Sequence, residues 1–123
     1  MVFKFTKVSL LVAVISLSGM SGTLFAQSIA SGVYKINNDK ITGAITVTPT
    51  NDGRFLFAGG TKTATGAECM INGPATLRGN ELEIGYKCTI RLNASENQIE
   101  IDDYKKCIPC DPGAYVSGIY RRQ

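Results

Sequence analysis

The sequence predicts an all-β fold, in which a small antiparallel meander of about eight strands closes into a barrel. Apolar and polar residues alternate along nearly every segment after Gln27, as they do in half-buried strands. Turn-forming residues separate these segments at intervals of about eight to twelve residues, and such short connections favour antiparallel pairing. Closure would remove the free sheet edges, and a two-layer sandwich is the alternative that the same pattern allows.

The predicted strands follow one another with short turns between them. Asn37–Lys40 is a polar turn, and Pro49-Thr-Asn-Asp-Gly53 is the strongest turn signal because Asp-Gly tolerates the positive φ of tight hairpins. The threonine-rich segment 61–65 is expected to be an edge or a loop. We expect the last strand to close the barrel by pairing with the first. In chain order the predicted strands are 32–36, 41–48, 54–58, 67–71 continued by 75–78, 81–87, 88–92, 99–102 and 114–121.

Residues 1–26 are predicted to be a signal peptide. Lys4 and Lys7 precede an apolar run of about ten residues, and a small residue stands at the expected cleavage site before Gln27. The apolar run is shorter than the roughly twenty residues that span a bilayer as a helix, although an uncleaved anchor is the alternative. We therefore expect one domain, 27–123, that is periplasmic or secreted and has no stable membrane anchor after cleavage.

The charge balance of this domain argues against a nucleic-acid partner. The chain has 13 basic and 10 acidic residues, and without Lys4 and Lys7 the basic residues number 11. The domain would then be nearly neutral, whereas nucleic-acid binders show a basic patch or stripe. About 97 residues are enough for one modest core, and domains of that size are commonly helped by cross-links.

The four cysteines, Cys69, Cys88, Cys107 and Cys110, predict two disulfides in an exported domain. The favoured pairing is Cys69–Cys88 with Cys107–Cys110, and crossed pairings such as Cys88–Cys107 are the alternatives. The favoured pairing assumes that Gly79-Asn80 is a two-residue hairpin turn, which places the strands of Cys69 and Cys88 side by side. A zinc site is not expected, because the chain has no His and only one close Cys pair.

The Cys107-Ile-Pro-Cys110 sequence could be a redox-active pair or a structural cross-link. Redox pairs place the first Cys at a helix N-terminus in a βαβ unit. Here Asp111-Pro-Gly113 follows immediately and blocks a helix, so we favour a structural role. Without His, Ser-His-Asp and Cys-His catalysis are excluded within the chain. The acidic pairs, such as Glu81 with Glu83, alternate with apolar residues as a solvated strand face does, so no enzymatic activity and no cofactor are expected.

Two tyrosines have matching sequence contexts, Ser31-Gly-Val-Tyr34 and Ser117-Gly-Ile-Tyr120, in the strands expected to close the barrel. One interpretation places both rings in the core or at the rim of the barrel, where they bridge the junction between the first and last strands. The other makes them part of a partner-binding rim together with Tyr115, Ser117 and Arg121, because Tyr and Arg are favoured interface anchors.

The order of these features resembles that of small exported bacterial proteins, mostly of unknown role. The shared outline is Gly-x-Tyr near the start, one Cys in each of two mid-chain strands, then Cys-x-x-Cys, Gly-Ala-Tyr and Ser-Gly-x-Tyr-Arg. In outline they are similar to the periplasmic lysozyme inhibitors, which are disulfide-bonded β-barrels that insert a loop into the lysozyme cleft. The resemblance implies a non-catalytic binding protein whose partner is a cell-wall hydrolase, and no inhibitory residue is transferred to this chain. A lipocalin-like carrier of small molecules and a structural envelope component are the alternatives.

Overall fold

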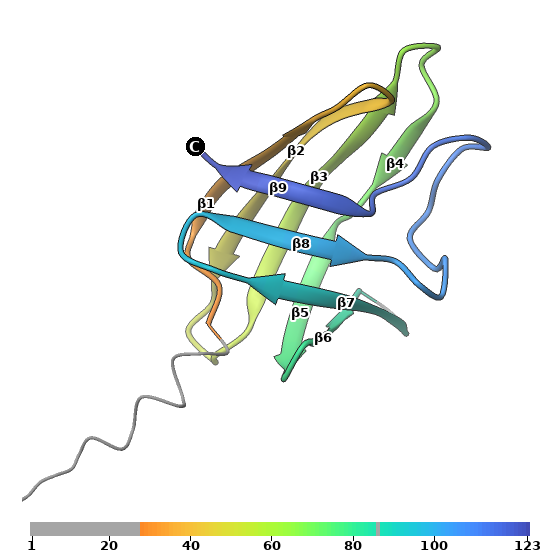
Figure 1. Cartoon of the computed structure of the whole chain (residues 1–123). Coiled ribbons are helices and arrows are strands. Elements are labelled where there is room, and N and C mark those ends of the chain that lie inside the picture. The colour runs from red at the N-terminus through yellow and green to blue at the C-terminus, as the bar shows by residue number, and fades with distance from the viewer. Residues whose placement is uncertain (1–27, 86) are drawn as a thin grey trace, which may run out of the picture.

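The computed structural model describes residues 28–85 and 87–123, and it confirms the closed β-barrel with two disulfides (Figure 1). The strand order β2-β1-β9-β8-β7-β6-β5-β3 returns to β2 through the β2–β3 pairing, so eight antiparallel strands close the barrel. The short strand β4 pairs with the second half of β3. The strands are β1 Gly32–Asn37, β2 Ile41–Pro49, β3 Phe55–Thr63, β4 Glu68–Met70, β5 Gly73–Arg78, β6 Glu81–Ile84, β7 Cys88–Ala94, β8 Gln98–Asp102 and β9 Gly118–Arg122.

The first and last strands close the barrel, as predicted. Tyr34 pairs with Arg122 and Lys35 pairs with Arg121 in the antiparallel β1–β9 ladder. The predicted signal peptide lies outside the described residues. Within the described part of the chain, no helix has the length and apolarity needed to cross a membrane.

Strand β3 is longer than the sequence indicated, because it continues through Gly59 and into the segment 61–65, expected to be an edge or a loop, and ends at Thr63. It pairs with β5 over its first residues and with β4 over its last, and Gly59 lies at the change of partner. Gly59 has φ +149°, and a Cβ there would lie 2.0 Å from the carbonyl oxygen of Ala44. The Asn72 side chain replaces a backbone partner at this point, since its Oδ1 accepts the Gly59 N–H at 3.0 Å.

Apolar side chains fill the barrel interior. Six of these side chains are each at most 8% exposed, and they come from three strands, β2, β3 and β6. They are Ile45, Val47, Phe55, Phe57, Leu82 and Ile84. Close packing of the interior speaks against a carrier that holds a small molecule inside the barrel, because such barrels leave an open cavity.

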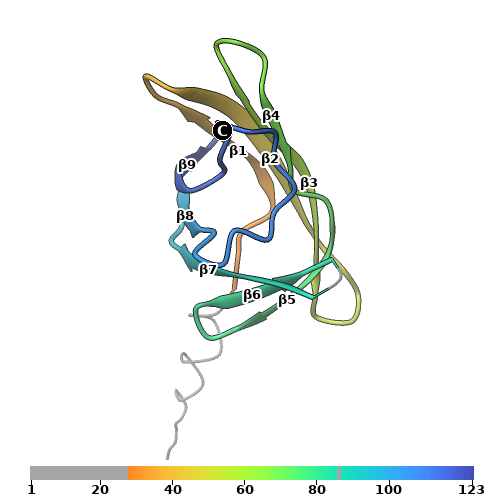
Figure 2. The ribbon, with the colours of Figure 1, turned by 90° about the vertical axis from the view of Figure 1, so that its right-hand side faces the viewer.

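The last strand begins later than expected, at Gly118 instead of Ala114. Residues 103–117 between β8 and β9 form no strand of their own and make an irregular segment, which we call the strap. Seen along the barrel axis, the strap runs across the ring of strands at one end (Figure 2). Two of its side chains, Ile108 and Val116, are buried in the core, so the strap closes this end of the barrel.

Candidate functional site

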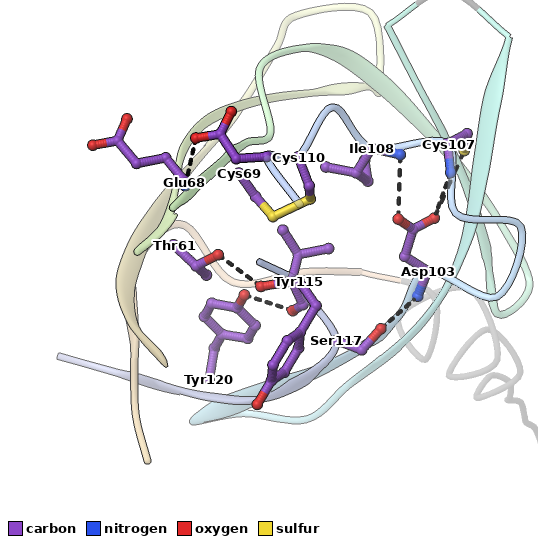
Figure 3. Close-up of a disulfide and its surroundings, with 12 residues drawn as sticks. Thr61, Glu68, Cys69, Asp103, Cys107, Ile108, Cys110, Tyr115, Ser117 and Tyr120 are labelled. Atoms are coloured by element: carbon purple, nitrogen blue, oxygen red, sulfur yellow. Dashed lines mark hydrogen bonds between the residues drawn. A yellow bond between two sulfur atoms is a disulfide. The ribbon is translucent and has the colours of Figure 1, made fainter. Parts of the chain in front are cut away.

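The strap is attached to β4 by a short stretch of sheet-like pairing. Met70 donates its backbone N–H to the Pro109 carbonyl at 3.0 Å, and Asp111 donates to the Glu68 carbonyl at 2.8 Å. The Cys69–Cys110 disulfide lies in the middle of this pairing (Figure 3). The strap therefore acts as a neighbour for β4, which would otherwise present a free strand edge.

The second disulfide attaches an earlier part of the strap to the opposite wall. It joins Cys107 to Cys88, the first residue of β7. The favoured pairing, Cys69–Cys88 with Cys107–Cys110, is therefore wrong, and each strap cysteine bonds to a different strand. Since Cys107 and Cys110 are not bonded to each other, the strap contains no Cys-x-x-Cys disulfide of the redox type.

The error in the pairing comes from an unrecognised turn. The Gly79-Asn80 hairpin forms as expected, with Arg78 across from Glu81. The predicted pairing requires the register of this hairpin to continue from Ile84 to Cys88, but Gly85 and Lys87 have φ of +61° and +66° and turn the chain again. Cys88 consequently lies across from Ile84 on β6 and away from β4.

Asp103, at the start of the strap, organises the segment around its carboxylate. Its Oδ1 accepts the Cys107 N–H at 3.0 Å and its Oδ2 accepts the Ile108 N–H at 3.2 Å. Its own backbone N–H donates to Ser117 Oγ at 2.9 Å, which joins the two ends of the strap (Figure 3). Asp103 is not among the functional residues predicted from the sequence. An Asp that directly follows a strand and precedes backbone donors is the signal that could have identified it.

Asp103 also lies beside the second disulfide, without forming a metal site there. The Asp103 carboxylate and the sulfurs of Cys88 and Cys107 lie within 4.8 Å of one another. Both sulfurs are bonded to each other, so neither is available as the thiolate that a metal ion would need.

Tyr34 and Tyr120 are buried, with relative exposures of 0%, and neither ring forms part of a partner-binding rim. The matching contexts reflect a repeated structural motif instead. Each hydroxyl donates to a backbone carbonyl four residues earlier, Tyr34 to Ala30 and Tyr120 to Val116, as in a tyrosine corner. Burial raises the pKa of the Tyr120 phenol well above its ordinary value, and nearby Tyr115 adds to the rise.

The other three residues predicted for the rim have different environments. Tyr115 is half-buried against the core, and its carbonyl accepts the hydroxyl of the buried Thr61 at 2.7 Å (Figure 3). Ser117 is half-buried and bonded to Asp103. Arg121 is exposed on β9, away from the strap, so these residues do not form one patch with the tyrosines.

An apolar crevice of about 380 Å³ lies where the strap meets the wall of the barrel. One side is formed by the strap residues Cys107–Pro109, and the other by the β4–β5 connection and the end of β6. Met70 lies at its rim with a relative exposure of 57%. A flexible, polarizable Met beside an apolar crevice adapts to apolar side chains of a partner.

The outer surface of the strap carries cationic and aromatic groups. The Arg91 guanidinium lies 4.1 Å from the centre of the Tyr104 ring, and the Tyr104 hydroxyl donates to Glu81 at 3.0 Å. Lys105 and Lys106 follow in the chain and are exposed. The strap thus presents a basic and aromatic surface whose backbone is held by two disulfides.

No protein-family model, curated protein or solved structure matches this chain. The features of the molecule that bear on its function are the strap, the crevice beside it and the filled barrel that supports both.

Proposed function

We propose that the protein is a non-catalytic binding protein of the bacterial envelope that inhibits a cell-wall hydrolase such as lysozyme. The observation that carries the proposal is the strap, a surface segment fixed to both walls of a filled barrel by two disulfides. A loop that is already ordered binds its partner without the entropy cost of ordering, which favours loops that enter an enzyme cleft. The crevice beside the strap would receive an apolar side chain of the hydrolase.

Two features support the proposed location in the periplasm. Two disulfides in a small domain are typical of an oxidising, extracytoplasmic environment. The leader pattern of residues 1–26 supports export, and the periplasm is where hydrolases that degrade the cell wall would meet the protein.

The direct test is a cell-wall lysis assay with purified, disulfide-bonded protein and lysozymes of the C, g and i types. We expect protection of the cell wall against at least one type at a stoichiometric amount of protein. Absence of protection against all three at a clear excess would refute the lysozyme version of the proposal.

A matched pair of variants tests whether the strap end is the contact surface. Met70→Glu places a charge at the rim of the crevice and should weaken inhibition by about tenfold or more. Leu56→Glu is the control, because Leu56 is 47% exposed on β3 and does not line the crevice. Equal loss of inhibition in both variants would show that the contact surface lies elsewhere.

A further inference from the structure

The ladder that closes the barrel, between β1 and β9, is unusually short. It contains two residue pairs, whereas β1 pairs with β2 at six positions. Figure 1 shows the two strands meeting near the C-terminus and diverging toward the β1–β2 turn. The Gln123 backbone N–H donates to the Val33 carbonyl at 2.8 Å. Hydrogen-bonded pairs recur at every second residue of an antiparallel ladder, so the backbone groups of Val33, Lys35 and Asn37 are directed toward β9. The next pair that would exchange hydrogen bonds after Lys35–Arg121 is Asn37 with Ile119, and the ladder ends before it.

The divergence is built into the packing of the two strands. Ile36 is buried, and its side chain lies against Gly118. If residue 118 had a Cβ atom, that atom would lie 2.6 Å from Cδ1 of Ile36. The Ile36 side chain therefore occupies the position that a side chain at residue 118 would need, and Gly118 has φ +149°. A side chain at 118 would require Ile36 to move, and residues other than glycine rarely adopt a φ of +149°, so the close approach of Ile36 favours glycine here.

A surface hollow of about 730 Å³ lies along the diverging strands. Its lining combines two cationic side chains, one carboxylate and three side-chain amides with two isoleucines, of which Ile36 is buried and Ile119 is exposed. The residues that matter are Lys35, Asn37, Glu100, Ile119 and Arg121. Ile119 is 44% exposed, and it lies beyond the last residue pair of the β1–β9 ladder.

Two cations face each other at the closed end of this hollow. Lys35 lies directly across from Arg121, an arrangement that destabilises a sheet when no anion lies between the charges. Neither forms a salt bridge with an acidic residue of the described chain. Arg121 donates to the neutral Gln98 side chain at 3.3 Å, which positions the guanidinium without neutralising it.

These features together specify a carboxylate ligand. A carboxylate accepts its strongest hydrogen bonds from charged donors such as the Lys35 ammonium and the Arg121 guanidinium. Glu100 lines the hollow on the β8 side, across from Ile119, and its negative charge disfavours ligands with several negative charges such as phosphate.

We propose that this hollow, between β1 and β9, binds the free C-terminal carboxylate of an extended peptide. An extended chain that follows the hollow reaches its closed end where Lys35 and Arg121 pair, so a chain terminus fits there. The peptide carboxylate contacts the two cations, and its last side chain packs against Ile119. This recognition mode, capture of a terminal carboxylate by charges and backbone donors, is independent of the strap and of the proposed hydrolase inhibition.

The test is an NMR titration of purified, disulfide-bonded protein with three peptides. They are acetyl-trialanine with a free carboxylate, the same peptide as its C-terminal amide, and acetyl-Ala-Glu-Ala amide. The free acid should bind with a dissociation constant in the millimolar range or tighter, and shift the amides of Lys35, Ile119 and Arg121. The amide should bind at least about tenfold more weakly, because it lacks the charge that the cations recognise.

The variant Lys35→Gln/Arg121→Gln should bind the free acid at least about tenfold more weakly while remaining folded, because the change removes a repulsive pair. The control Arg54→Gln/Lys62→Gln removes the same charge elsewhere on the barrel and should leave binding unchanged. Equal binding of acid and amide, or no binding of either, would overturn the proposal. Tighter binding of the glutamate peptide than of the free acid, or equally strong shifts with inorganic phosphate, would also overturn it.

Discussion

The wall of the barrel and the strap that crosses its end are stabilised by different interactions. The wall is an antiparallel sheet over an apolar core, in which each of the eight barrel strands pairs with a strand on both sides. The strap has two buried apolar residues and little backbone pairing, and it is held by two disulfides, the Asp103 carboxylate and a few side-chain hydrogen bonds. The comparison shows how a small barrel carries an irregular surface segment without losing its order.

Loss of the disulfides should produce the largest effect. The Cys69→Ala/Cys110→Ala variant loses the disulfide between residues 41 positions apart in the sequence. Because the unfolded chain then gains the entropy that this covalent loop removed, the free energy of unfolding should fall by about 4 kcal/mol. Cys88→Ala/Cys107→Ala opens a 19-residue separation and should lose about 3 kcal/mol. Urea unfolding measures both values. A much smaller loss in both variants would show that the strap is ordered without its cross-links.

The next effect concerns the Asp103 carboxylate. Asp103→Ala removes two acceptors from the backbone N–H groups of Cys107 and Ile108, and should cost about 2 kcal/mol. Hydrogen exchange should accelerate at these two amides and stay unchanged in β2, which lies in the wall. Asp103→Asn is the matched control, because its amide oxygen retains one acceptor and it should lose less. Uniform acceleration across the wall would mean that strap and barrel unfold as one unit.

The buried tyrosine hydroxyls should have intermediate effects. Tyr120→Phe leaves the buried Val116 carbonyl without its donor and should cost about 1.5 kcal/mol. Tyr34→Phe should cost less, about 1 kcal/mol, because its hydrogen bond is only partly buried. Thermal unfolding measures both changes. A larger loss for Tyr34→Phe would contradict this ranking of the two sites.

The same hydroxyls predict how stability depends on pH. Burial raises the folded-state pKa of Tyr34 and Tyr120 above 10.0, so the folded chain retains protons that the unfolded chain releases. Their contribution is complete below about pH 10 and is lost as pH rises further, toward the folded-state pKa. Tyr120→Phe should flatten this alkaline decline in short unfolding measurements. An equally steep decline in the variant would assign it to other groups.

The smallest effect should come from the exposed contacts of Tyr104. Its ring stacks under Arg91 and its hydroxyl donates to Glu81, but such surface contacts contribute little. Tyr104→Leu should change the unfolding free energy by less than about 1 kcal/mol. A loss as large as that of Asp103→Ala would show that the outer surface of the strap contributes to its order.

The wall was predictable from sequence because its rules are local. Alternation gave the buried faces of β1, β2 and β6, and turn residues such as Asp52-Gly53 and Gly79-Asn80 gave the hairpins. The register of a hairpin follows from its turn, so the pairing of Arg78 with Glu81 could be derived. Closure between β1 and β9 followed from the need to remove sheet edges.

The strap was not predictable because its partners are distant in the sequence. Alternation of Val116 with Tyr115 and Ser117 is typical of a strand, yet these residues bond to Thr61 and Asp103 instead of a ladder. The disulfide pairing required knowing that Cys69 lies beside the strap, which depends on β3 changing partners at Gly59. Long-range pairing of this kind leaves no periodic signal.

The two disulfides also divide the molecule topologically. The Cys69–Cys110 bond closes a covalent ring that contains β5, β6, β7 and β8, and the Cys88–Cys107 bond is nested inside it. A proteolytic cut at the Gly79-Asn80 turn would therefore leave one covalent molecule. A cut in the turn between β2 and β3 would leave a fragment with β1 and β2 attached only by its hydrogen-bond ladders and core packing. Four barrel strands therefore lie within a covalently closed ring, whereas β1 and β2 are joined covalently to the rest of the barrel only through the turn between β2 and β3.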